Sequence, residues 1–132
     1  MIDHITFGVS DFTRLAAFYD RAFAPLGVRR LFDESGGAEK VVGYGDDRPW
    51  FWIADGAPTS GPLHVALRAG SRAAVEGFHR EAVAAGGSDN GGPDLRPHYH
   101  PGYYAAFVLD PEGRNIEAVF HDPSVAHAPD RL

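Results

Sequence analysis

The chain has 132 residues, which is enough for one compact domain and too few for two of ordinary size. Apolar residues make up 44% of it, a proportion that supports a buried core and argues against a disordered chain. Its 12 basic and 18 acidic side chains give a net charge of −6, so it lacks the positive field that binds nucleic acids or anionic membranes. We therefore expect neither of these partners.

The chain contains no cysteine, which excludes disulfides, thiolate metal sites and cysteine nucleophiles. Any metal must then be bound by His, Asp or Glu side chains. The N-terminus lacks the basic and apolar regions of a signal peptide, and no apolar run reaches the roughly 18 residues of a membrane span. We therefore expect a soluble, cytoplasmic protein.

The first predicted strand lies near the N-terminus. Three apolar residues alternate there with three small or polar ones: Ile5, Phe7 and Val9 against His4, Thr6 and Gly8. Because successive side chains of a strand point to opposite faces, His4 should project from the face opposite the apolar row.

A helix should follow, because apolar side chains recur with helical spacing at Leu15, Phe18, Tyr19, Ala22, Phe23 and Leu26. Ser10 or Asp11 can cap its start, and Gly27 stands where a helix commonly ends. Three strands, over residues 28–33, 40–45 and 49–54, then complete a first unit. The Gly- and Pro-containing stretch 55–62 forms the boundary that follows it.

The second unit opens in the same way. His64 lies in a predicted strand, on the face opposite its apolar row, and Ser71 can cap the helix that Gly86 and Gly87 end. The stretch 86–102 holds five Gly, three Pro and two His, and irregular segments of that length are usually functional or disordered. A hairpin of residues 103–109 and 115–120 follows, and a loose tail begins at Pro123.

The two units repeat each other. When the chain is shifted by 60 residues, residues 4–27 align with 64–87, and five of the 24 pairs are identical. These are His4/His64, Phe18/Phe78, Ala22/Ala82, Ala24/Ala84 and Gly27/Gly87. Since the order of predicted elements also matches, we interpret the chain as two copies of one strand–helix–strands unit.

Glu117 lies within the last strand, on the face opposite its apolar neighbours Ile116 and Ala118. A carboxylate at such a position is costly to bury without a partner. Together with His4 and His64 it would form an open site for one divalent metal, such as Fe, Mn, Ni, Co or Zn. Strand histidines are more often packing residues than ligands, but their equivalent positions in the two units favour the metal site.

Further candidates lie in the irregular stretch and on the strands. His98 and His100 are candidate general acids or bases, and the alternative for them is a solvated loop. Of the tyrosines that follow, Tyr104 is a candidate catalytic residue and Tyr103 a candidate for binding the substrate. Trp50 and Trp52 would form either a wall for the substrate or part of the core. Arg68, on the His64 face, would bind an anionic substrate or form a surface ion pair.

Three segments resemble the vicinal oxygen chelate superfamily, which comprises glyoxalases, bleomycin resistance proteins and extradiol dioxygenases. They are Ile2–Val9 with the Phe18-Tyr19 helix behind it, Leu63–Ala66, and Tyr103–Glu117 with its Asp-Pro-Glu-Gly-Arg-Asn-Ile-Glu run. The resemblance covers residues 1 to about 122 and implies an α+β domain of two βαβββ modules, about 1–56 and 61–122. Their sheets would form a curled mixed sheet around a central cleft. It also implies His4, His64 and Glu117 as the metal ligands, and a homodimer.

The sequence departs from the glyoxalase I type of this superfamily at one position. Those enzymes have a fourth ligand on the last strand of the first module, where the repeat places Trp52. An indole cannot bind the ion, so the resemblance points instead to three-ligand enzymes, the thiol transferases and extradiol dioxygenases. We therefore expect a metal-dependent enzyme, a glyoxalase-like lyase or transferase or a dioxygenase, whose small-molecule substrate chelates the ion through oxygen. The alternative is a non-catalytic drug-binding protein of the bleomycin-resistance type.

Overall fold

The computed structural model describes residues 1–125 as two modules with the same order of elements. The first contains β1 (Ile5–Val9), α1 (Phe12–Phe23), a 3-10 turn (Ala24–Leu26), β2 (Arg29–Asp33), β3 (Val41–Gly45) and β4 (Pro49–Asp55). The second contains β5 (His64–Arg68), α2 (Arg72–Ala84), β6 (Ser88–Asp89), β7 (Asp94–Leu95), β8 (Tyr103–Leu109) and β9 (Asn115–His121). The predicted α+β fold of two βαβββ-type modules in mixed sheets is thereby confirmed.

Each module forms one mixed sheet, in the orders β1-β4-β3-β2 and β5-β9-β8-β6, with β7 also pairing to β8. The first strand of each module runs parallel to the last one. Thr6 lies opposite Trp52 in one sheet, and Ala66 lies opposite Glu117 in the other. Because Thr6 and Ala66 are 60 positions apart, this register confirms the alignment of the repeat.

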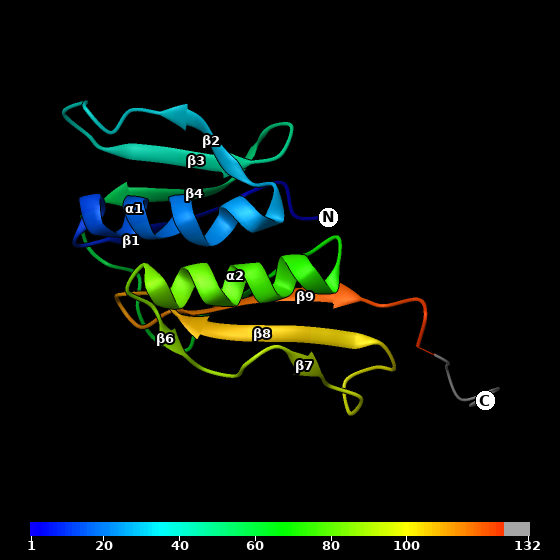
Figure 1. The fold of residues 1–132 in the computed structure, drawn as a ribbon. Helices are drawn as coiled ribbons and strands as arrows, with labels where there is room; N and C mark the ends of the chain where they lie inside the picture. Colours follow the sequence, from blue (N-terminus) through cyan, green and yellow to red (C-terminus); the bar gives the residue numbers. More distant parts are fainter. Residues whose placement is uncertain (126–132) are drawn as a thin grey trace.

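The two helices pack against each other and lie on the same side of the sheets (Figure 1). As predicted, Asp11 and Ser71 cap them, by accepting hydrogen bonds from the backbone N–H groups of Arg14 and Ala74. The first α-helix ends at Phe23, three residues before its apolar stripe does. Pro25 accounts for the early end, since it has no N–H to continue the helical hydrogen bonds.

The segment 86–102 is more regular than expected. It contains β6 and β7, two strands of two residues each, and both are antiparallel to β8. Gly91, Gly92 and Pro93 separate them, and these are residues that interrupt a strand. The second strand of this module, the counterpart of β2, is therefore present as two short pieces.

An aromatic cluster fills the space between the first sheet and α1. The ring of Phe51 lies edge-on to those of Phe7 and Phe23, with centroids 5.1 and 4.9 Å apart. All three side chains are buried. Because Phe51 faces the helix, its strand neighbours Trp50 and Trp52 belong to the opposite face of the sheet.

The turn between β8 and β9 joins the two modules. Arg114 is 2% exposed and forms an ion pair with Asp110 over 3.0 Å. It also donates hydrogen bonds to the backbone oxygens of Gly8 and Thr59, 2.8 and 3.1 Å away. The turn is thus anchored both to the first strand and to the segment between the modules.

Glu112, in the same turn, binds the start of α1. Its carboxylate accepts hydrogen bonds from the backbone N–H groups of Ser10 and Asp11 and from Arg114. Burial raises the pKa of Glu112, but these donors outweigh it and lower the pKa from 4.5 to about 2. A helix N-terminus also stabilises a negative charge.

This lowered pKa predicts a loss of stability in acid. Glu112 stabilises the folded state fully above its unfolded pKa of 4.5, and that contribution is lost as the pH falls toward 2. The Glu112→Gln variant should therefore lose about 2–3 kcal/mol at pH 7 and show a flatter pH dependence of unfolding between pH 4.5 and 2. Urea titrations across this range would measure both effects. The exposed Glu39→Gln is the matched control, and an equal acid slope in the two variants would contradict the assignment.

No helix in the described part of the chain is both long and apolar enough to cross a membrane. The predicted tail from Pro123 falls mostly outside the described residues.

Candidate metal centre

Glu117 lies in the middle of β9 and is 1% exposed, on the sheet face opposite α2. Nε2 of His64 is 2.8 Å from its Oε1 atom. The Tyr103 hydroxyl donates a hydrogen bond to its Oε2 atom. Both carboxylate oxygens therefore have partners, which is what a buried carboxylate requires.

Neighbouring side chains enclose the carboxylate. Phe107 lies opposite Glu117 on β8, and its ring centroid is 5.9 Å from that of His64. Burial, together with the nearby Glu117 charge, raises the pKa of Tyr103. Tyr103 consequently remains a neutral hydroxyl donor over the whole physiological range.

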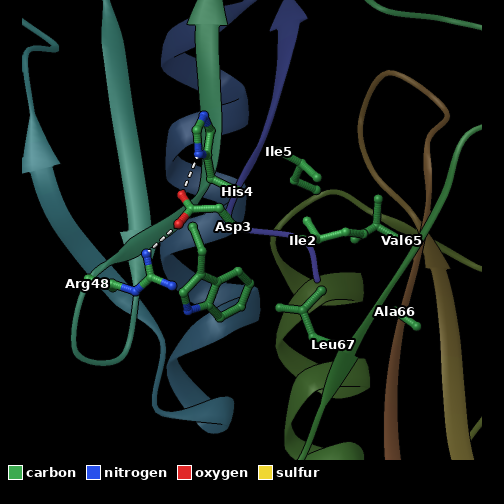
Figure 2. A pocket seen from close by; sticks show the side chains of 9 residues that line it. Ile2, Asp3, His4, Ile5, Arg48, Val65, Ala66 and Leu67 are labelled. Carbon is green, nitrogen blue, oxygen red and sulfur yellow. Dashed lines mark hydrogen bonds and ion pairs between the residues drawn. The ribbon is translucent and has the colours of Figure 1, made fainter.

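His4 lies apart from this pair. Its Nδ1 atom is 2.7 Å from Oδ1 of Asp3, whose other oxygen accepts a hydrogen bond from Arg48 over 2.9 Å (Figure 2). The bonds to His4 and Arg48 lower the pKa of Asp3. The His4 side chain is 56% exposed. Its second ring nitrogen, Nε2, makes no hydrogen bond within residues 1–125.

The structure therefore brings together two of the three predicted ligands. Within residues 1–125, no group of three His, Asp or Glu side chains is arranged to hold a metal ion. His4 and His64 instead line two adjacent hollows, of about 350 and 560 Å³, between β1 and β5. The hollows share the side chains of Ile2, Ile5, Val65 and Ala66.

Tyr104, one of the predicted catalytic residues, faces away from Glu117. Its hydroxyl donates a hydrogen bond to Glu76 of α2 over 2.7 Å, and the Arg72 guanidinium lies 4.7 Å above its ring. Neighbouring residues of a strand point to opposite faces, so only one of Tyr103 and Tyr104 can reach the site. That residue is Tyr103, whose hydroxyl bonds Glu117, whereas Tyr104, predicted as a catalytic residue, faces α2.

His98 and His100 approach the site through aromatic neighbours. The His98 ring lies 4.2 Å from that of Tyr99, which is 5.1 Å from the Tyr103 ring. His100 lies 6.2 Å from the ring of His121. Neither His98 nor His100 has a hydrogen bond to the Glu117 carboxylate.

The two tryptophans share the sheet face opposite α1. Trp50 donates a hydrogen bond to Asp46 over 3.1 Å and lines the hollow that contains His4. Trp52 packs against Phe32, with ring centroids 5.2 Å apart. It is partly exposed and is therefore not a core residue.

Two further polar side chains belong to the surroundings of the predicted ligands. Arg68 is exposed at the end of β5 and has no ion pair within the described residues. Asp3 was not among the predicted residues, yet it orients the His4 ring. The signal available in the sequence was its position directly before a predicted ligand, since histidine ligands commonly donate their second N–H to a carboxylate.

The family model for the Glyoxalase/Bleomycin resistance protein/Dioxygenase superfamily matches residues 1–118. The chain belongs to this superfamily. The resemblance carried by the first strand of each module and by the last hairpin is thereby confirmed. No protein of curated function matches the chain.

Solved structures of superfamily members share the fold. A glyoxalase/bleomycin resistance protein from Albidiferax ferrireducens T118 is 25% identical, with a TM-score of 0.74 over 89% of this chain and 96% of its own. A glyoxalase-related enzyme from Fulvimarina pelagi is 24% identical, with a TM-score of 0.66 over 97% and 98%. The fosfomycin resistance protein FosX from Listeria monocytogenes, solved with Mn(II) and a dihydroxypropylphosphonic acid, is 18% identical, with a TM-score of 0.64 over 90% of each chain.

Proposed function

We propose that this superfamily member is a cytoplasmic metalloenzyme whose small-molecule substrate chelates one divalent ion through oxygen. The observation that carries the proposal is the His64–Glu117 pair: a buried carboxylate and an imidazole nitrogen 2.8 Å apart on adjacent strands. Relatives in this superfamily are enzymes, and one is solved with Mn(II). The specific reaction would be of the glyoxalase, transferase or dioxygenase type.

The imidazole nitrogen of His64 and the carboxylate oxygens of Glu117 are the types of donor atom that bind such an ion. Imidazole nitrogen and carboxylate oxygen suit Fe, Mn, Ni, Co and Zn, but residues 1–125 of one chain bring only two such side chains, His64 and Glu117, together. We propose that His4 of a second copy of the chain provides the third ligand. This is supported by the exposure of His4 and by its bond to Asp3, which leaves Nε2 available to a metal.

The ion would supply Lewis-acid stabilisation of negative charge on substrate oxygen. The Tyr103 hydroxyl would hold one oxygen of Glu117 in place and so fix the orientation of the carboxylate. His98 and His100, in the segment that leads to Tyr103, are the proposed proton carriers. Trp52 would form a flat wall for a planar substrate.

A test with mixed variants addresses both the ligands and the location of the site. The His4→Ala and His64→Ala variants should each lose most of their metal, whereas the wild type retains about one ion per chain. If the site lies between two chains, mixing the two variants restores one intact site per heterodimer, because each partner supplies the histidine that the other lacks. Mn²⁺ titration with size-exclusion chromatography measures this recovery.

The expected result is recovery of about half of the wild-type sites within the heterodimer. Near-stoichiometric metal in both separate variants would contradict the ligand assignment. Loss of metal in both without recovery on mixing would place the site within one chain. The variant His79→Ala serves as the control, since His79 bonds Asp89 on the surface of the second module.

A second candidate function is metal-independent binding of an aromatic small molecule, as in drug-sequestering proteins. The observation that favours it is Trp52, which is packed against Phe32 where a fourth ligand would otherwise stand. Titration of metal-free protein with a planar aromatic cation separates the two functions. Unchanged affinity in Glu117→Gln would support the binding protein.

A further inference from the structure

The Tyr103 side chain must lean along the sheet to reach Glu117. Tyr103 pairs with His121 in the register of β8 and β9, and Glu117 lies four residues back along β9. Four residues of extended strand span about 13 Å. Because the side chains of a sheet stand roughly perpendicular to it, an upright tyrosine could not cover this distance. The hydrogen bond from Tyr103 to Glu117 therefore requires the tyrosine ring to lie over the strands.

Two further rings contact the Tyr103 ring. The His121 imidazole lies edge-on to it, with centroids 5.4 Å apart and planes at 90°. The Tyr99 ring lies 5.1 Å away at 61°. Both contacts have the edge-to-face geometry that aromatic pairs favour. The Glu117 carboxylate bonds His64 and Tyr103, so these two flanking rings, Tyr99 and His121, act on it through Tyr103.

Backbone hydrogen bonds, rather than burial, set the positions of the flanking rings. Both side chains are exposed, that of Tyr99 to 59%. Tyr99 donates from its N–H to a backbone oxygen three residues earlier, over 3.0 Å. Next to His121, Asp122 donates to the Gly102 oxygen and accepts a hydrogen bond from Arg72 of α2, each over 2.7 Å. Gly102 has a φ of 83°, and a Cβ there would collide with the Asp122 oxygen.

We propose that Tyr99 and His121 are positioning residues of the proposed metal site. They hold the Tyr103 ring over the sheet, so that its hydroxyl keeps the Glu117 carboxylate in the orientation that binds the ion. Hydrogen-bond partners of metal ligands commonly change metal affinity by about 10–100-fold, and the flanking rings act one contact further out. This inference rests on the proposed function and adds two residues to it.

The first measurement uses metal-free, full-length protein whose tyrosine rings carry ¹³C. A hydroxyl proton bonded to a buried carboxylate exchanges slowly with water, so Tyr103 should give a hydroxyl NMR signal that Tyr103→Phe removes. This proton should exchange about three- to tenfold faster in Tyr99→Ala and in His121→Ala, which each lose one ring contact. It should exchange as in the wild type in His121→Phe, which keeps a ring. His79→Ala, on α2, is the control and should change nothing.

The second measurement is Mn²⁺ affinity by titration calorimetry. His121→Ala should bind the ion about three- to tenfold more weakly than the wild type, and His121→Phe should bind it equally well. If the imidazole acts through Tyr103, adding His121→Ala to Tyr103→Phe brings no further loss. A residue with a merely structural role would weaken binding equally in both backgrounds.

Unchanged hydroxyl exchange in Tyr99→Ala and His121→Ala would overturn the proposal. So would the absence of a Tyr103 hydroxyl signal from the wild type, or an undiminished effect of His121→Ala in the Tyr103→Phe background. If the wild type binds no Mn²⁺, the proposed function fails, whereas the exchange measurement still decides whether the flanking rings hold Tyr103. Thermal melts identify any variant that does not fold, and the exposed Tyr99→Ala then carries the comparison.

Discussion

Replacing Arg114 by Met is expected to lower the free energy of unfolding by about 3–5 kcal/mol, which is the usual cost of removing one partner of a buried ion pair. The variant would leave the buried Asp110 carboxylate without its cation. The backbone oxygens of Gly8 and Thr59 would lose their donors at the same time. Since these groups belong to both modules, the whole domain should be affected rather than one hairpin.

Urea unfolding would measure this loss. The control is Arg21→Met, which breaks the exposed ion pair with Glu81 and should change stability by less than about 1 kcal/mol. Adding Asp110→Asn to Arg114→Met should recover part of the loss, because no unpaired charge then remains buried. Similar effects of Arg114→Met and Arg21→Met would show that the turn does not hold the modules together.

The sequence predicted the fold well where it depends on local periodicity. Alternation along β9 placed Glu117 on the face opposite its apolar neighbours, and the capping residues Asp11 and Ser71 marked the helix starts. His64 is the first residue of β5, whereas His4 lies one residue before β1. Strands β6 and β7 escaped prediction because two residues are too few to show a period of two.

The arrangement between modules could not be predicted in this way. Periodicity gives the face on which a side chain lies, but not its distance from a residue of another sheet. His4 and His64 were therefore expected in one site, whereas the structure places them in adjacent hollows. Likewise, the predicted hairpin of residues 103–109 and 115–120 implies a turn between its strands, but not the burial of Arg114, which depends on Gly8, over a hundred residues away.

The remaining prediction concerns Trp52, and it depends on the register of the repeat. Trp52 lies opposite Thr6 just as Glu117 lies opposite Ala66. His4 precedes Thr6 by two residues, as His64 precedes Ala66. A glutamate at position 52 should therefore reach His4 in the way that Glu117 reaches His64.

Trp52→Glu is expected to bind Mn²⁺ at least tenfold more tightly than the wild type, because it adds a fourth, charged ligand to the proposed site. Loss of the contact with Phe32 should cost about 1–2 kcal/mol of stability in the metal-free protein. Gly43, the residue paired with position 52 on β3, has no side chain that the glutamate would meet.

Trp52→Gln is the matched control, because it has nearly the same shape as the glutamate variant but no charge. Thermal melts with and without Mn²⁺ should show metal stabilisation that is larger in Trp52→Glu than in the wild type, and no such gain in Trp52→Gln. Equal melts of the two variants with Mn²⁺ would mean that position 52 does not face the ion. Trp52 and Glu117 would then occupy equivalent positions in their sheets, but only Glu117 would face the metal.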